Sequence, residues 1–179
     1  MKRLLLLRHG KSDWAGGALN GGLDDVDRPL APRGIKAAPV MGQYLRARKL
    51  IPDLVLCSAA RRTRQTWDLV AAELGTAPEV RFLKSLYLAP PSRLLGAVRK
   101  APAAAKTLLL IGHNPGLAGL ALRLAGGGRR KDLAALADKF PTCALAVIDL
   151  DISGWPEVGD GGGRLTAFVR PRDLTKDLA

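Results

Sequence analysis

The 179-residue chain has little of several residue types that mark whole classes of proteins. It has two cysteines, Cys57 and Cys143, so a disulfide framework is excluded and a reducing compartment is expected. Aromatic residues make up only 4%, and no base-stacking platform for nucleic acid is visible. Acidic residues are also few, since 28 Lys and Arg stand against 16 Asp and Glu, for a net charge of +12. This excess suits an anionic partner and does not specify a fold.

Long hydrophobic runs are absent as well. The sequence opens with Lys2-Arg3 and an apolar run at 4–7, but this run is shorter than the roughly 7–15 residues of a signal-peptide core. No uncharged apolar stretch of about 18 residues could cross a bilayer. We therefore expect a cytoplasmic protein without a membrane partner. At roughly 100–200 residues per domain, the length predicts a single domain over residues 1–179.

What the chain does have is an alternation of strand and helix patterns. Short apolar runs predict buried strands at 3–7, 54–57, 108–111 and 144–150, with weaker candidates at 80–83 and 165–169. Helical patterns lie at 33–49, 61–74, 92–100 and 114–124, the last with Asn114 as N-cap and Pro115 in the first turn. Glycine clusters at 16–17, 21–22, 126–128 and 161–163 predict loops. The alternation indicates a mainly parallel sheet covered by helices on both faces.

Both histidines of the chain follow predicted buried strands. His9 comes directly after the run at 3–7, and His113 comes after the run at 108–111. In open α/β sheets the ligand crevice lies outside the carboxyl ends of the strands. We therefore predict that His9 and His113 share one site.

Arginines gather at the same strand ends. Arg8 precedes His9, and Arg61, Arg62 and Arg64 open the helix that follows the strand at 54–57. A helix N-terminus and guanidinium groups both favour a bound phosphate. Periodicity alone does not decide which of the three helix arginines faces the site.

Two other motif assignments, a phosphate-binding P-loop and a zinc site, are not supported by the spacing of the residues. Gly10-Lys11-Ser12 resembles the end of a phosphate-binding P-loop, but the glycine required five positions earlier is Leu5. The two cysteines and two histidines include no closely spaced ligand pair, so a zinc site is not indicated. We expect no metal and no cofactor.

Four segments, in order along the chain, resemble the motifs of the histidine phosphatase superfamily, the phosphoglycerate-mutase-like enzymes. They are Arg8-His9-Gly10, then Asp27-Arg28-Pro29-Leu30 with Arg33-Gly34, then residues 58–66, and Gly112-His113-Asn114-Pro115. Leu86-Tyr87, the short chain and the spelling Arg28-Pro29-Leu30 are similar to the SixA-type phosphohistidine phosphatases. The resemblance implies a phosphoglycerate-mutase-like fold, a three-layer α/β/α sandwich around a mainly parallel sheet.

The resemblance also assigns roles. It implies a metal-independent phosphatase in which His9 attacks phosphorus, while Arg8, Arg62 and a protonated His113 neutralise the phosphoryl oxygens. It selects Arg62 among the three helix arginines. Residues of second rank for phosphate or substrate contacts are Arg28, Lys11, Ser12 and Asn114, the last of which could equally be only a helix cap.

One departure from the family bears on the substrate. Many members carry an acidic residue after the third strand, whereas residues 82–93 contain no carboxylate. Asp24, Asp25 and Asp27 stay open as substitutes. A phosphohistidine needs less help from a proton donor than an alkyl ester does, so the absence of this acidic residue favours a phosphorylated protein as substrate. The alternatives are a small phosphomonoester as substrate and, from another class, a basic nucleic-acid-binding protein, which only the charge supports.

Overall fold

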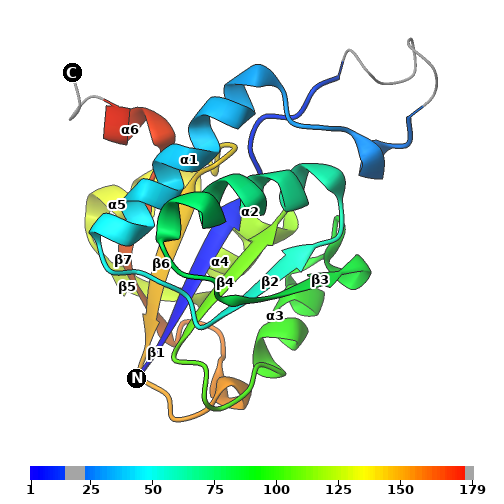
Figure 1. Cartoon of the computed structure of the whole chain (residues 1–179). Coiled ribbons are helices and arrows are strands. Elements are labelled where there is room, and N and C mark those ends of the chain that lie inside the picture. The colour runs from blue at the N-terminus through cyan, green and yellow to red at the C-terminus, as the bar shows by residue number, and fades with distance from the viewer. Residues whose placement is uncertain (15–22, 176–179) are drawn as a thin grey trace.

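Seven strands form one mixed sheet in the computed structural model of the chain, which describes residues 1–14 and 23–175 (Figure 1). The strands are β1 (Lys2–Arg8), β2 (Leu54–Ser58), β3 (Glu79–Leu83), β4 (Thr107–Gly112), β5 (Ala125–Gly128), β6 (Leu145–Leu150) and β7 (Gly163–Val169). Their order is β3-β2-β4-β1-β6-β7-β5. The first four are mutually parallel, β6 runs antiparallel to β1 and to β7, and β5 is parallel to β7.

Helices cover both faces of this sheet, as predicted. One face carries α1 (Pro32–Ala47), α2 (Arg61–Leu74) and the short α6 (Pro171–Thr175), and the other carries α3 (Pro91–Arg99), α4 (Gly116–Leu124) and α5 (Arg130–Asp138). Three 3-10 turns complete the described elements: η1 (Asp25–Asp27), η2 (Lys84–Leu86) and η3 (Trp155–Glu157). The mainly parallel three-layer sandwich is therefore confirmed.

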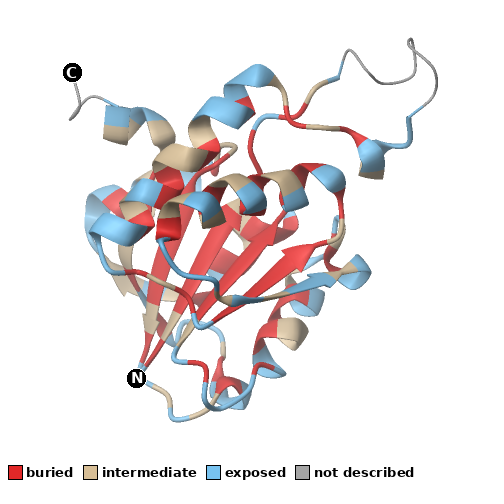
Figure 2. Ribbon diagram, viewed as in Figure 1, coloured by how far each residue is buried: buried red, intermediate tan, exposed pale blue. Residues whose placement is uncertain are grey.

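The leucine run of β1 supplies both halves of the core. Leu5 and Leu7 face α1 and α2, while Leu4 and Leu6 face α3 and α4, because successive side chains of a strand point to opposite faces. All four are fully buried, and Figure 2 shows the central strands buried along most of their length. The run of apolar residues without polar alternation follows from this two-sided burial.

The glycine cluster at 126–128 is a strand where a loop was predicted. Residues 125–128 form the edge strand β5, which pairs with β7. A Cβ atom on Gly126 would lie 2.0 Å from the Gly161 carbonyl oxygen, and one on Gly128 would lie 2.6 Å from that of Leu165. The glycines thus allow close approach of two backbones, a use of glycine that resembles a loop signal in sequence. The clusters at 16–17 and 21–22 lie outside the described residues.

The predicted helix at 114–124 begins later than expected. Its first residue is Gly116, Pro115 is at the cap position, and the Asn114–Pro115 peptide bond is cis. The assignment of Asn114 as N-cap with Pro115 inside the first turn is therefore wrong. Helices α5 and α6 were not predicted at all, since both are short. Among the described residues, no helix is long and apolar enough to span a membrane.

The segment before α1 fixes the loop that follows β1. Ala31 donates its backbone N–H to the Lys11 carbonyl oxygen at 2.8 Å, and Ser12 forms a bridge with Leu30. A Cβ atom on Gly34 would lie 2.3 Å from the Lys11 carbonyl oxygen, so any side chain there would push α1 off the loop. The glycine is required by this contact rather than by its backbone torsion angles.

Replacing Gly34 by alanine should therefore destabilise the protein by about 1–3 kcal/mol, the usual cost of overpacking a well-packed contact. The matched control is Gly96→Ala in α3, where an added Cβ would meet nothing within 4 Å. Alanine is the better helix former by up to about 1 kcal/mol, so the control should be neutral or stabilised. Chemical denaturation of both variants measures the difference, and equal stabilities would contradict the contact.

Candidate active site

A cleft of about 300 Å³ lies at the carboxyl ends of β1, β2 and β4. It contains all eight residues that the sequence analysis singled out, together with four others. The lining residues are Arg8, His9, Lys11, Ser12, Trp14, Asp25, Arg28, Arg62, Leu88, His113, Asn114 and Thr142. The expected convergence of Arg8, His9, Arg62 and His113 at this sheet edge is therefore what the structure shows.

His9 is held in one tautomer. Its Nδ1 lies 2.7 Å from the Gly10 carbonyl oxygen, which can only accept, so Nδ1 carries the hydrogen and Nε2 keeps its lone pair. Burial lowers the pKa of His9 to about 4. The hydrogen bond to Gly10 by itself raises this pKa, whereas the charges of Arg62 and Arg8 lower it further. At neutral pH the ring is therefore uncharged, with a free lone pair on Nε2.

His113 lies beside His9 and is also neutral. The two ring centroids are 5.2 Å apart, and Nε2 of His113 lies 2.7 Å from the Ser58 hydroxyl oxygen. Burial lowers the pKa of His113 to about 3, assisted by His9 and Arg62. This differs from the protonated His113 implied by the family resemblance. The protein's own charges disfavour that proton, and a negatively charged group beside the ring would be needed to raise the pKa.

The two arginines are anchored by only part of their guanidinium groups. Arg8 donates from Nη1 to the Phe140 carbonyl oxygen at 3.0 Å, and Arg62 donates to the backbone and side chain of Asp25 at 2.8 and 3.1 Å. Within the described residues, the buried side-chain polar atoms without a hydrogen-bond partner are Nε of Arg8, Nε of Arg62 and Nδ1 of His113. All three belong to the predicted site, where further hydrogen bonding is thus possible.

Asp25 is the carboxylate of the cleft. Its side chain accepts hydrogen bonds from Arg62, from Arg28 at 2.8 Å and from the Tyr87 hydroxyl. Burial by itself would raise the pKa of Asp25, but the Tyr87 hydrogen bond and the two arginine charges lower it to about 2. Asp25 is therefore ionised at neutral pH and holds no proton to donate.

Of the other two aspartates left open by the sequence, neither lines the cleft. Asp24 and Asp27 are both exposed. The side chain of Asp25 could be placed only by the structure, because all three lie in one short acidic segment. Tyr87 and Ser58 were likewise missed as site residues, although both fall inside segments that resemble family motifs.

The second-rank residues divide into two kinds. Asn114 donates to the Phe140 carbonyl oxygen at 2.9 Å and accepts from the Ala118 N–H at 3.3 Å, so both ends of its amide hold backbone in place. Arg28 is buried, pairs with Asp25 and stacks on the Trp14 ring with its guanidinium carbon 3.7 Å from the centroid. Asn114 therefore supports the cleft, and Arg28 with Trp14 forms part of its wall.

The remaining motif residues fix the backbone around the site. The Thr66 hydroxyl accepts the Gly10 N–H at 3.0 Å and donates to the Arg62 carbonyl oxygen at 2.6 Å. Gln65 accepts the Leu30 N–H at 2.8 Å. Helix α2 thus ties together the loop after β1 and the segment that leads to α1, and it carries Arg62 between them.

The chemistry of the cleft suits an anion. Among residues 1–14 and 23–175, no group of three or more His, Cys, Asp and Glu side chains is placed to hold a metal ion. The cleft that holds the two imidazoles is lined by four cationic side chains, those of Arg8, Arg28, Arg62 and Lys11, and by one carboxylate, that of Asp25. Guanidinium groups pair with phosphate oxygens in bidentate fashion, so a phosphoryl group is the expected ligand.

Comparison with known proteins agrees with this geometry. The family model of the histidine phosphatase superfamily (branch 1) matches residues 4–86. An uncharacterized protein of Mycobacterium tuberculosis is 38% identical over 169 residues, which is 93% of this chain and 100% of the relative. A solved structure from Agrobacterium tumefaciens, provisionally named phosphohistidine phosphatase SixA, is 30% identical with a TM-score of 0.78, covering 95% of this chain and 98% of that one.

The chain belongs to the histidine phosphatase superfamily. A second solved structure, from Nakamurella multipartitia and provisionally named in the same way, is 29% identical with a TM-score of 0.77 and covers 95% of this chain and 96% of that one. Both similarities extend through the second half of the chain, which the family model does not reach. The fold of this superfamily member is thus phosphoglycerate-mutase-like, as the motifs implied.

The two neutral histidines predict how stability depends on pH. In the unfolded chain they titrate near their ordinary pKa of about 6.5, while in the folded protein they resist protonation to about 4 and 3. The free energy of unfolding should therefore fall as pH is lowered from 6.5 to 4.5, with a slope that approaches about 1.4 kcal/mol per pH unit for each histidine. Urea denaturation at several pH values measures this slope.

The control for that measurement is the His9→Asn, His113→Asn double variant. It keeps Asp25, whose lowered pKa of about 2 makes it lose stability only at more acidic pH. The slope of the double variant between pH 6.5 and 4.5 should be clearly shallower. Equal slopes for the two proteins would show that the histidines are not held neutral by the fold.

Proposed function

We propose that this protein is a metal-independent phosphatase that removes the phosphoryl group from phosphohistidine on a protein, through a covalent intermediate on His9. The observation that carries the proposal is the hydrogen bond between Nδ1 of His9 and the Gly10 carbonyl oxygen. It leaves a neutral imidazole with its Nε2 lone pair free, which is the form that attacks phosphorus. The similarity of the chain to two solved structures provisionally named phosphohistidine phosphatase SixA supports the same substrate class.

In the first step, Nε2 of His9 attacks phosphorus in line with the leaving group. A bond forms between Nε2 and phosphorus while the bond from phosphorus to the substrate imidazole breaks, and its electron pair leaves with that imidazole. Arg8 and Arg62 stabilise the charge on the equatorial oxygens, the main source of catalysis in phosphoryl transfer. The unpartnered Nε atoms of both arginines are donors available for this purpose.

In the second step, water attacks the phosphorylated His9. A bond forms between the water oxygen and phosphorus while the bond between phosphorus and Nε2 breaks, and the electron pair of that bond returns to Nε2. Both hydrogens of the water leave with the orthophosphate, which can release one of them to solvent. His113 takes part through Nδ1, the buried nitrogen that has no partner in the described protein. A phosphoryl group beside it raises the pKa of the ring, so that His113 donates to phosphoryl oxygen in both steps.

The leaving group decides between substrate classes. Residues 82–93 hold no carboxylate, and the Asp25 carboxylate, with its pKa of about 2, carries no proton at neutral pH. An alkyl ester leaves as a strongly basic alkoxide and needs a proton donor. The imidazole of phosphohistidine can leave with its other nitrogen already protonated, so it has no such need. This supports phosphohistidine over small alkyl phosphates.

His9→Ala should abolish turnover, because the cleft offers no second nucleophile in the same position. His113→Ala and Arg62→Ala should each lose roughly 10²–10⁴-fold in kcat, the scale of one proton donor or charge-stabilising group. Rates are measured with a phosphohistidine peptide and with p-nitrophenyl phosphate, with and without EDTA. Turnover by His9→Ala, or loss of activity in EDTA, would contradict the mechanism.

A panel of substrates tests whether the cleft lacks a proton donor for the leaving group. Phosphohistidine and aryl phosphates should be hydrolysed faster than alkyl phosphates, and this order should persist in Asp25→Asn. Asp24→Asn is the control, since Asp24 does not line the cleft. Asp25 is assigned the role of anchoring Arg62 and Arg28 and not that of an acid. Selective loss of alkyl phosphate turnover in Asp25→Asn would make Asp25 the acid and favour small phosphomonoesters as substrates.

A further inference from the structure

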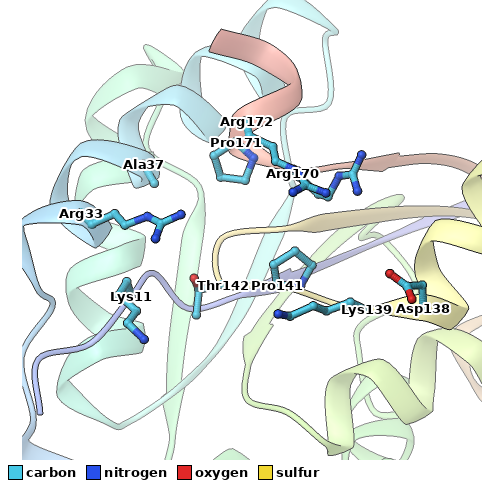
Figure 3. Close-up of a pocket in the computed structure, with 10 residues that line it drawn as sticks. All are labelled: Lys11, Arg33, Ala37, Asp138, Lys139, Pro141, Thr142, Arg170, Pro171 and Arg172. Atoms are coloured by element: carbon cyan, nitrogen blue, oxygen red, sulfur yellow. The ribbon is translucent and has the colours of Figure 1, made fainter. Parts of the chain in front are cut away.

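A second cleft adjoins the catalytic one. It has a volume of about 230 Å³ and lies between the start of α1, the segment between α5 and β6, and the start of α6 (Figure 3). The residues that line it are Lys11, Arg33, Ala37, Asp138, Lys139, Pro141, Thr142, Arg170, Pro171 and Arg172. We call it the basic cleft, since five of these side chains are cationic and one, Asp138, is acidic.

Most of this positive charge is not neutralised within the protein. Arg170 is the exception, since it forms a bidentate ion pair with Asp173 at 2.8 and 2.9 Å. In the part of the chain that the structure describes, no salt bridge joins Lys11, Arg33, Lys139 or Arg172 to a carboxylate. Their mutual repulsion is relieved by a bound anion, so the basic cleft attracts negatively charged ligands.

The cationic groups extend into a shared space. Figure 3 shows the Arg33 side chain and the Lys139 side chain extending toward each other from opposite sides, across Thr142 and Pro141. Arg33 comes from α1, Lys139 from the residue after α5, and Arg172 from α6. The charges are therefore distributed along the cleft over several chain segments, and all three of these side chains are exposed.

The basic cleft borders the catalytic cleft. Lys11 and Thr142 line both of them. Lys11 stands two residues after His9, on the loop that α1 holds in place. A protein substrate whose phosphoryl group sits against His9 therefore has the basic cleft next to the residues that flank its phosphohistidine.

We propose that the basic cleft binds an acidic segment of the substrate protein, with Asp and Glu side chains near the phosphohistidine in contact with Arg33, Lys139 and Arg172. This inference rests on the proposed function of the catalytic cleft. An extended acidic chain fits cations that are exposed and spread over several segments. A second phosphate of a small metabolite would instead require donors that converge on one point.

The test compares two phosphohistidine peptides, one with Asp and Glu flanking the phosphohistidine and one with Ser and Gln. The cleft variant is Arg33→Gln, Lys139→Gln, Arg172→Gln. Because it removes three exposed ion pairs, it should raise KM for the acidic peptide roughly 3–100-fold with kcat unchanged. KM for the neutral peptide and turnover of p-nitrophenyl phosphate should stay as in the wild type, which also shows that the variant is folded.

The matched control removes the same net charge elsewhere. Lys36→Gln, Lys100→Gln, Lys106→Gln replaces three exposed lysines that line neither cleft. It should leave KM for the acidic peptide close to the wild-type value. If the control and the cleft variant raise KM equally, only the overall charge matters and the proposal is overturned.

Direct binding separates this proposal from the proposed function. A fluorescent acidic peptide without phosphate is titrated with wild type and with the cleft variant, so that the result does not depend on turnover. Weaker binding to the cleft variant supports the acidic-segment proposal even if no phosphohistidine is hydrolysed. Equal binding overturns it, and so does displacement of the peptide by an oligonucleotide at lower concentration than by unlabelled peptide, since the cleft would then prefer nucleic acid.

Discussion

Two guanidinium groups and two imidazoles share the buried end of one sheet, and burial together with the arginine charges governs the protonation of the imidazoles. Burial is the largest effect that keeps His9 and His113 uncharged, and the charges of Arg62 and Arg8 add to it. Asp25 is kept ionised by the Tyr87 hydrogen bond and by Arg62 and Arg28, against the effect of its burial. The positive potential of the arginines thus acts in one direction on all three groups, because it disfavours an added proton. His9 is thereby kept neutral without a neighbouring base, because the fold itself disfavours a second proton on the ring.

The antiparallel insertion of β6 is what completes this site. Since β6 runs against β1, the residues that precede it arrive at the carboxyl end of β1. The Phe140 carbonyl oxygen there accepts from both Arg8 and Asn114, and the Cys143 N–H donates to the Arg8 and His9 carbonyl oxygens. An all-parallel sheet would place a strand's carboxyl end and a helix start at this point. Here a backbone turn supplies acceptors that orient a buried arginine.

Sequence reasoning predicted the parts of the structure that depend on local patterns. The leucine runs of β1 and β4 are buried on both faces, so their position and the histidines at their ends could be deduced from the sequence. The partner of each polar side chain could not, because it depends on segments far apart in the chain. Asp25 shows this: three nearby aspartates are equivalent in sequence, and only the fold brings one of them to Arg62. The strand at Ala125–Gly128 was missed because its glycines serve backbone contact, while glycine in sequence suggests a turn.

The pairing of β1 has a consequence for how the protein is made. Its two neighbours in the sheet are β4 and β6, which begin at Thr107 and Leu145, so nothing in the first hundred residues pairs with it. This strand, which carries Arg8 and leads into His9, is synthesised before both of its partners. Leu5 and Leu7 can pack on α1 and α2 early, but the backbone pairing of the strand waits for β4 and β6, and contacts of such large sequence separation form slowly. The cleft that holds His9 and His113 can therefore form only in chains synthesised past β4, and the Phe140 acceptor of Arg8 is present only once α5 has been completed.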